Sequence, residues 1–152
     1  MSADEDPRPD DGTTLAELTR DECLELLGGR MIGRVAVAEP GAAPLVVPVN
    51  YVLEGESVVF RTDYGSKFRL AVLGEQPVAF EIDGVEPGRR TGWSVLVQGT
   101  AHELDEAAGE ALGVEPWAPG RKDRWVRIVP SSLTGRRIQL PPVSGTDSRG
   151  YL

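Results

Sequence analysis

The sequence predicts a mainly β protein of one domain, an antiparallel barrel of six or seven strands with two or three short helices. Its 152 residues fit the size of a single domain. The 18 glycines and 12 prolines are about twice the usual share, which indicates many turns. Short apolar segments with a two-residue period lie between these turns and do not alternate with long helices. This pattern favours hairpin-linked strands over a doubly wound sheet.

The N-terminal part is predicted to be a tail followed by one helix. Residues 1–13 are expected to be a disordered acidic tail, because they hold five acids and a single arginine. A capping box of Thr19 and Glu22 begins the helix and a pair of glycines ends it, so the helix is expected over residues 19–27. Cys23, in the apolar stretch of this helix, is expected to be an inert core thiol.

The remaining elements follow from alternating apolar residues and the turns between them. Strands are expected at residues 32–38, 45–53, 57–62, 77–83, 93–104, 124–129 and 135–140, and short helices at 63–73 and 105–112. Residues 84–92 are expected to form a loop, and Gly99 a β-bulge. Pro48 lies inside a predicted strand and cannot donate to a ladder. That strand is therefore an edge, contains a bulge, or is lined there by something other than a strand.

Composition excludes several classes of protein. No apolar stretch approaches the ~20 residues that a membrane-spanning helix needs, and the N-terminus is acidic where a signal peptide would be basic. We therefore expect a cytoplasmic protein with no membrane partner. One cysteine and one histidine argue against a disulfide, a cysteine-based zinc cluster and a histidine-dependent triad, and no metal site is expected. The net charge of −8 argues against nucleic acid as a partner.

The strongest local candidate for a binding site lies where a predicted strand passes through a glycine turn into a helix. Amides at a helix start attract anions, and Arg61, Thr62, Ser66 and Lys67 add hydroxyl groups and positive charges there. A phosphate is the natural ligand of such a group, although the Walker A pattern is absent. The alternative is a helix capped by Asp63 or Ser66 beside two surface cations.

Two further segments have both a binding and a structural interpretation. In the strand that contains Pro48, the Asn50 side chain and the backbone groups that the proline leaves unpaired can hold a flat heterocycle. The alternative there is a bulge beside a core tyrosine. Trp93 opens a long strand and either stacks on a ligand or packs in a core, and Trp117 and Trp125 share that ambiguity.

Six segments follow one another in a characteristic order. They are GRVAV (33–37), PLVVPVNY (44–51), VVFRTDYGSK (58–67), VAFEID (78–83), GWSVLVQGTA (92–101) and RIVPSSLTGRR (127–137). In this order they resemble the pyridoxamine 5′-phosphate oxidase-like family, the FMN-binding split β-barrels. The resemblance extends over about residues 15–140, and it is greatest to a small actinobacterial-type branch of the family.

The resemblance implies an FMN-binding split β-barrel domain over residues 14–141, followed by a flexible tail at 142–152. It implies a homodimer with the cofactor sites at the interface between the two chains. It assigns the flavin ring and ribityl chain to Val47, Pro48, Val49 and Asn50, the 5′-phosphate to Arg61, Thr62, Ser66 and Lys67, a strand position that reaches the flavin to Trp93 and Ser94, and an approach from the other chain to Arg136 or Arg137.

The resemblance also implies an FMN-dependent oxidoreductase acting on a small-molecule substrate. Relatives that oxidise vitamin B6 carry a C-terminal R-L-H-D-R stretch that clamps the substrate phosphate, whereas residues 135–140 of this chain are GRRIQL. Pyridoxamine 5′-phosphate is therefore not the expected substrate, and the sequence nominates no general acid or base. Two alternatives stay open: a reductase that uses the deazaflavin F420 on the same fold, and a non-enzymatic flavin- or haem-binding module.

Overall fold

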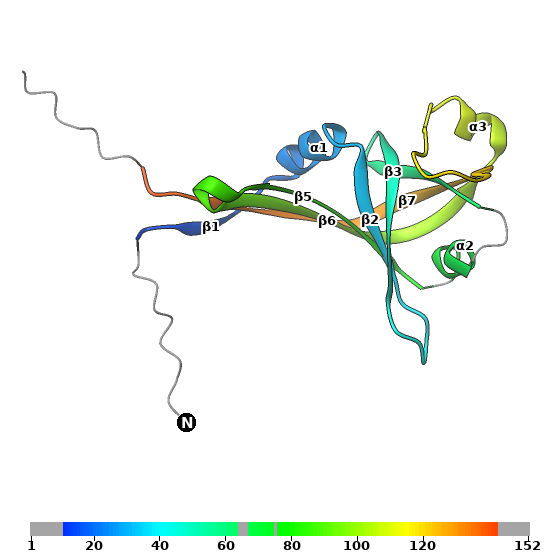
Figure 1. The fold of residues 1–152 in the computed structure, drawn as a ribbon, viewed down its shortest axis with the longest axis horizontal. Coiled ribbons are helices and arrows are strands. Elements are labelled where there is room, and N and C mark those ends of the chain that lie inside the picture. The colour runs from blue at the N-terminus through cyan, green and yellow to red at the C-terminus, as the bar shows by residue number, and fades with distance from the viewer. Residues whose placement is uncertain (1–10, 64–66, 75, 143–152) are drawn as a thin grey trace, which may run out of the picture.

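The computed structural model describes residues 11–63, 67–74 and 76–142, which form a mainly β fold with short helices (Figure 1). In chain order the elements are β1 (Thr14–Glu17), α1 (Arg20–Gly28), β2 (Ile32–Val37), β3 (Leu45–Glu54), β4 (Ser57–Thr62), α2 (Lys67–Val72), β5 (Val78–Glu86), the 3-10 helix η1 (Pro87–Arg89), β6 (Thr91–Leu104), α3 (Glu106–Glu110) and β7 (Arg124–Gln139). Most of the predicted acidic tail, Ser66 and nearly all of the predicted C-terminal tail lie outside the described residues.

The strands form an antiparallel barrel. They pair in the order β1-β7-β4-β3-β2-β5-β6, and a further pairing of β6 with β7 closes β2 to β7 into a six-stranded ring. β1 lies outside that ring and pairs with the end of β7, from Thr14↔Gln139 to Glu17↔Arg136. The predicted barrel of six or seven strands is therefore confirmed. β1 was not predicted, because its four residues show no alternation of apolar and polar side chains. They form a strand by pairing with β7.

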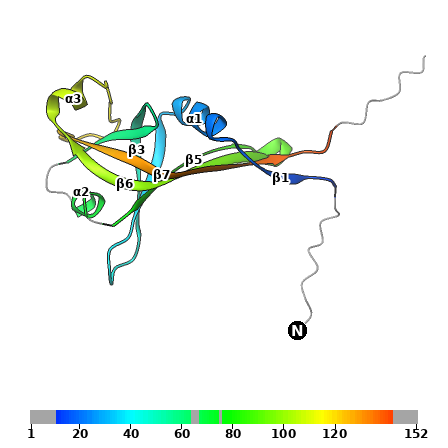
Figure 2. The ribbon, with the colours of Figure 1, turned by 180° about the vertical axis from the view of Figure 1, so that it is seen from behind.

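A long arm extends from one end of the barrel, opposite to α2 and α3 (Figures 1 and 2). We define the arm as residues 84–93, the tip of the β5–β6 hairpin, together with residues 135–139 at the end of β7. The prediction of a loop at residues 84–92 is wrong, because β5 continues to Glu86 and pairs as far as Glu86↔Thr91. The glycines in this segment allow the backbones of β5 and β6 to approach each other closely. A Cβ on Gly92 would lie 2.7 Å from the Gly84 carbonyl oxygen.

β7 is a single strand of 16 residues, where the sequence analysis predicts two strands separated by residues 130–134. The predicted bulge at Gly99 explains why β7 continues without a break. The β6–β7 register shifts between Gln98 and Gly99, and the pairing then resumes with Gly99↔Pro130. A proline, which lacks an amide proton, is tolerated where the ladder is already interrupted. A Cβ on Gly99 would lie 2.0 Å from the Val129 carbonyl oxygen, so the bulge requires glycine at this position.

The barrel interior is filled by alternate residues of the strands, and α1 packs beside it. Along β2, Val35 and Val37 are buried while Arg34 is exposed, as the two-residue period predicts. The predicted cap of α1 is confirmed, because the Glu22 amide donates to Thr19 Oγ1 over 3.2 Å. Cys23 on α1 is fully buried, and this burial raises the pKa of its thiol. It is thus the core thiol that the sequence predicts.

Candidate functional site

The first half of β3 is an open edge of the barrel. Residues 45–50 pair only with β2, from Ile32↔Asn50 to Val37↔Leu45, whereas the β3–β4 ladder begins at Tyr51↔Phe60. Pro48 lies in this half, so the edge interpretation of the proline is confirmed. β4 continues past the last β3 pair to Thr62 while pairing with β7. β3 and β4 therefore separate, and an opening begins between Asn50 and Arg61.

The predicted ring-lining residues of β3 alternate between two faces. Residues paired across an antiparallel ladder share a face. Val47 pairs with the buried Val35 and Val49 with Gly33, so both face the barrel interior. Pro48 and Asn50 face outward. Their side chains are the ones in this half of β3 that can lie against a flat ring on the outside of the barrel, while Val47 and Val49 can contribute backbone groups at the open edge.

The outer face also carries two of the residues predicted on β6 and β7. Ser94 pairs with Arg136 on β7 and with Asp83 on β5, whose carboxylate accepts from the outward Arg34 over 3.3 Å. Pro48, by comparison, is the partner of Arg34 on β2. Along the sheet, β2 and β5 lie between β3 and β6, which makes three strand spacings of ~4.8 Å, whereas β7 is two strands from β3 by way of β4. Within one chain, Pro48 and Asn50 therefore do not share a ladder with Ser94 or Arg136.

Arg61, at the predicted phosphate turn, is held by protein groups. Its Nε donates to the Lys122 carbonyl over 2.7 Å, its Nη1 donates to the Val114 carbonyl over 3.3 Å, and its guanidinium lies 4.7 Å from the centre of the Trp125 ring. These contacts bind the segment of residues 114–122, which we call the strap, to the end of β4. The sequence analysis does not predict the strap, since its turn residues carry no recognised pattern.

The strap also reaches Asn50 on the other side of the opening. The Trp117 amide donates to Asn50 Oδ1 over 2.8 Å, and Asn50 Nδ2 donates to the Met31 carbonyl over 3.4 Å. A second anchor joins Lys122 Nζ to Asp63 over 3.0 Å. The strap therefore spans the gap between β3 and β4, using Asn50 and Arg61, two of the residues predicted to contact the cofactor.

Of the helix predicted over residues 63–73, the structure describes α2 at Lys67–Val72, which includes the predicted phosphate ligand Lys67. Asp63 and Leu73, the two ends of the prediction, are not helical. Thr62 is buried, with 4% of its surface exposed. Ser66 and the side chain of Lys67 lie outside what the structure describes.

The three tryptophans have different environments. Trp125 is buried against Val59 and Val114 in a small second core cluster, which confirms the core interpretation for this residue. Trp117 exposes 63% of its surface beside Asn50. Trp93 is half-buried and lies on the inner side of the arm, where it pairs with Arg137.

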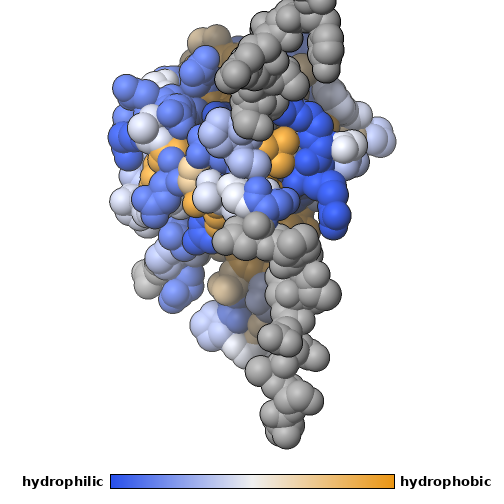
Figure 3. All heavy atoms as spheres, turned by 90° about the vertical axis from the view of Figure 1, so that its left-hand side faces the viewer, coloured by the Kyte–Doolittle hydropathy of each residue, from blue (hydrophilic) through white to orange (hydrophobic). Residues whose placement is uncertain are grey.

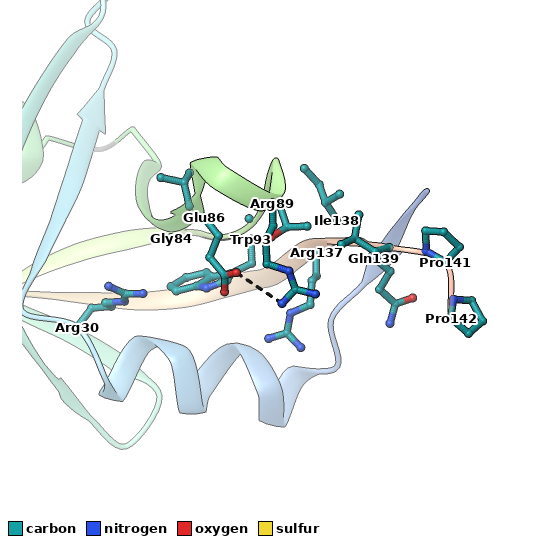
Figure 4. Close-up of a pocket in the computed structure, with 14 residues that line it drawn as sticks. Arg30, Gly84, Glu86, Arg89, Trp93, Arg137, Ile138, Gln139, Pro141 and Pro142 are labelled. Carbon is teal, nitrogen blue, oxygen red and sulfur yellow. Dashed lines mark ion pairs between the residues drawn. The ribbon is translucent and has the colours of Figure 1, made fainter. Parts of the chain in front are cut away.

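Trp93 and Arg137 line a pocket of about 530 Å³ that extends along the arm from Arg30 to Pro142, which we call the arm pocket (Figure 4). The Trp93 ring lies against Gly84, where a Cβ would approach ring atoms to 2.7 Å, and the Arg30 guanidinium lies 4.9 Å from the ring centre. Arg89, paired with Glu86 over 3.7 Å, also lines it. Seen from the arm end, the molecular surface is mainly hydrophilic (Figure 3).

Other chemical groups of the described chain form no separate centre. Within the part of the chain that the structure describes, no group of three or more His, Cys, Asp or Glu side chains could hold a metal ion. Glu81 and Asp83, which share a strand face, both accept from Arg34. His102 is exposed and lies 3.3 Å from the Thr100 hydroxyl. No helix in the described ranges has the length and apolar character required to cross a membrane.

Comparison with known proteins identifies the family. The family model described as pyridoxamine 5′-phosphate oxidase matches residues 19–137. The uncharacterized protein Rv0080 of Mycobacterium tuberculosis is 36% identical over 137 residues, which cover 86% of this chain and 90% of the relative.

Solved structures give the same result. A FAD binding protein from Mycobacterium smegmatis matches with 34% identity and a TM-score of 0.68, covering 80% of this chain and 97% of that one. A FAD-binding protein from Mesorhizobium loti matches with 25% identity and a TM-score of 0.67, covering 81% and 97%. The mycobacterial relatives agree with the actinobacterial branch inferred from the motifs. This chain therefore belongs to the pyridoxamine 5′-phosphate oxidase family, as its sequence predicts.

Proposed function

We propose that this protein binds a flavin and is a flavin-dependent oxidoreductase acting on a small molecule. The observation that carries the proposal is the similarity over most of the chain to two solved proteins named for FAD binding. The open edge of β3 beside the β4–α2 turn supports it. There Asn50 lies across the opening from Arg61, one of the residues that the sequence nominates for a phosphate, and the strap joins the two.

We propose FMN as the cofactor, on the motifs at residues 44–51 and 58–67. The names of the relatives make FAD the first alternative, and F420 and haem remain the others. When bound, a flavin supplies the redox chemistry through its isoalloxazine ring. The chain would supply a flat outward surface at Pro48, the second N–H of the Asn50 amide for the polar edge of the ring, and the Lys67 cation for the phosphate.

The separation of the predicted residues supports a homodimer with shared sites. The outward residues of β3 and Ser94 on β6 are separated along the sheet by three strand spacings of ~4.8 Å, with β2 and β5 between them. In a dimer, β3 of one copy and β6 of the other would contact the same flavin. The outer face also exposes apolar side chains on three strands, with exposed fractions of 41% for Ile32, 58% for Val46 and 36% for Leu96.

The decisive experiment is a visible spectrum of the purified protein with mass analysis of any small molecule that is released. Flavin bands with a released mass of FMN support the proposal. A released mass of FAD supports a flavoprotein whose cofactor is FAD and not FMN. A Soret band indicates haem. A colourless protein that takes up no flavin but turns over F420 indicates the reductase alternative. A solution mass of one chain, measured by light scattering in the presence of FMN, would contradict the shared site.

Lys67 provides the sharpest test of the phosphate position. Replacing Lys67 with Ala should weaken FMN binding about 10- to 150-fold, the equivalent of ~1.5–3 kcal/mol for a charge-assisted hydrogen bond. Fluorescence titration of the apoprotein with FMN measures this. The matched control is Arg20→Ala, which removes an exposed cation paired with Glu56 at the β3–β4 turn. Equal FMN affinity in both variants would remove Lys67 from the site.

A further inference from the structure

Trp117, near the middle of the strap, is the most exposed of the three tryptophans. It exposes 63% of its surface, whereas Trp125 exposes 3% and Trp93 is half-buried. Within the described part of the chain, the Trp117 indole makes no ring–ring or cation–π contact, although Trp93 and Trp125 each lie beside an arginine. A single exposed apolar side chain is common on a protein surface. What distinguishes Trp117 is how firmly the chain holds it.

The strap is fixed on both sides of Trp117. At its start, Val114 is buried in the second core cluster with 4% of its surface exposed, and its carbonyl accepts from Arg61 Nη1 over 3.3 Å. At its end, the Lys122 carbonyl accepts from Arg61 Nε over 2.7 Å, and Lys122 Nζ pairs with Asp63 over 3.0 Å. A side chain on a segment that is already fixed loses less conformational entropy when a ligand covers it.

A third anchor places Trp117 at the outward surface of β3. Its amide donates to Asn50 Oδ1 over 2.8 Å. Asn50 lies two residues after Pro48 on the same outward face, about 6–7 Å farther along the strand. Val46, two residues before Pro48, is 58% exposed and extends this surface in the other direction. A flat ring that rests on Pro48 and reaches the Asn50 amide therefore also reaches the strap at Trp117.

We propose that Trp117 is a contact of the flavin ring, with its indole packed against the isoalloxazine at the Asn50 end of the Pro48 surface. This inference rests on the proposed function and adds to the site a residue that lies outside the binding motifs of the sequence. Pro48 and Val46 offer aliphatic surface, and the indole adds an aromatic ring. Two aromatic rings in offset or edge-to-face contact are stabilised beyond the area that they bury. FMN and FAD share the isoalloxazine ring, so the contact applies to both.

Fluorescence titration of the full chain with FMN tests the contribution of the indole to binding. Trp117→Ala should weaken FMN binding about 2- to 12-fold, which corresponds to the ~0.5–1.5 kcal/mol of an aromatic pair. Trp117→Phe keeps a ring that can stack and should recover most of the lost affinity. The matched control is Glu115→Ala, which shortens another exposed side chain of the strap and should leave the affinity unchanged. Circular dichroism checks that each variant is folded.

The emission of the bound flavin separates direct contact from an effect through the strap. An indole that touches an excited flavin donates an electron to it and quenches its fluorescence, whereas a phenyl ring does not. Because Trp93 can also quench, the comparison is made between Trp93→Phe and Trp93→Phe/Trp117→Phe, each saturated with FMN. The emission per bound flavin should be higher in the double variant.

Three results would overturn this inference and leave the proposed function intact. The first is equal FMN affinity in wild type and Trp117→Ala. The second is an equal loss of affinity in Glu115→Ala, which would assign the effect to the strap as a whole. The third is equal emission from the two variants that carry Trp93→Phe. A wild-type chain that binds neither FMN nor FAD would instead refute the proposed function, and this inference with it.

Discussion

Gly33 offers a direct test of the packing that positions the open edge of β3. It lies on β2 opposite Val49, on the inner face of the barrel. A Cβ at this position would lie 2.1 Å from Cζ of Phe80 and 2.5 Å from its Cε2. Non-bonded carbons are at their optimum at about 3.5–4.0 Å, so the ring would have to move by more than ~1 Å in Gly33→Ala.

The surroundings of Phe80 resist that movement. The ring is fully buried and packs edge-on against Tyr51 with 4.8 Å between ring centres. Tyr51 is fixed in turn by its hydroxyl, which donates to the Leu27 carbonyl over 2.5 Å. Overpacking of this kind costs ~1–3 kcal/mol, and the rigid surroundings place Gly33→Ala at the upper end. A loss of ~2–3 kcal/mol corresponds to a fall in Tm of about 4–12 °C for a chain of this size.

Thermal unfolding followed by circular dichroism measures the effect. Gly88→Ala is the matched control, because a Cβ there meets no atom within 4 Å. The double variant Gly33→Ala/Phe80→Leu should be more stable than the sum of the single changes predicts, since the smaller side chain removes the clash. An unchanged Tm for Gly33→Ala, or additive effects in the double variant, would refute this account of the barrel interior.

Two further predictions concern Tyr51 and Arg61. Burial raises the pKa of Tyr51 from 10.0 to about 12, although nearby Arg30 opposes the shift. The associated stability, about 2–3 kcal/mol, is fully present below pH 10 and is lost as the pH rises through 12. Urea unfolding at pH 8 to 11.5 should show this loss in the wild type, and a Tyr51→Phe variant with the same loss would assign it to other groups. Arg61→Met should release the strap, because the Lys122 and Val114 carbonyls both lose their donor, and amide hydrogen exchange across residues 114–122 should increase. The control Arg127→Met breaks an ion pair with Glu54 and should leave the strap protected from exchange.

Sequence patterns predicted those elements that are fixed by interactions between residues close together in the chain. The capping box at Thr19 predicts the start of α1, and the alternation around Val35 predicts which face of β2 is buried. The order of six motifs predicts the family and the barrel. The proline at position 48 predicts an edge, a bulge or a neighbour other than a strand, because a residue without an amide proton does not fit a central ladder position in any fold.

Long-range pairing explains what the local patterns missed. Residues 84–92 have the composition of a loop, but β6 supplies partners that extend the hairpin to Glu86↔Thr91. The proline within β7 suggests a break, but the bulge at Gly99 on another strand absorbs it. β1 has no pattern of its own and exists as a strand through its pairing with β7.

The candidate sites divide in the same way. The sequence by itself determined the family, the barrel class and the residue types able to hold a phosphate, because periodicity, caps and turn chemistry act between near neighbours. Tertiary structure alone decided that Asn50 and Arg61 are joined by the strap, that Trp93 pairs with Arg137 and Ser94 with Arg136, and that Arg30 lies on Trp93. Each of these contacts joins segments far apart in the chain, and the register between strands selects which face of the sheet each side chain occupies.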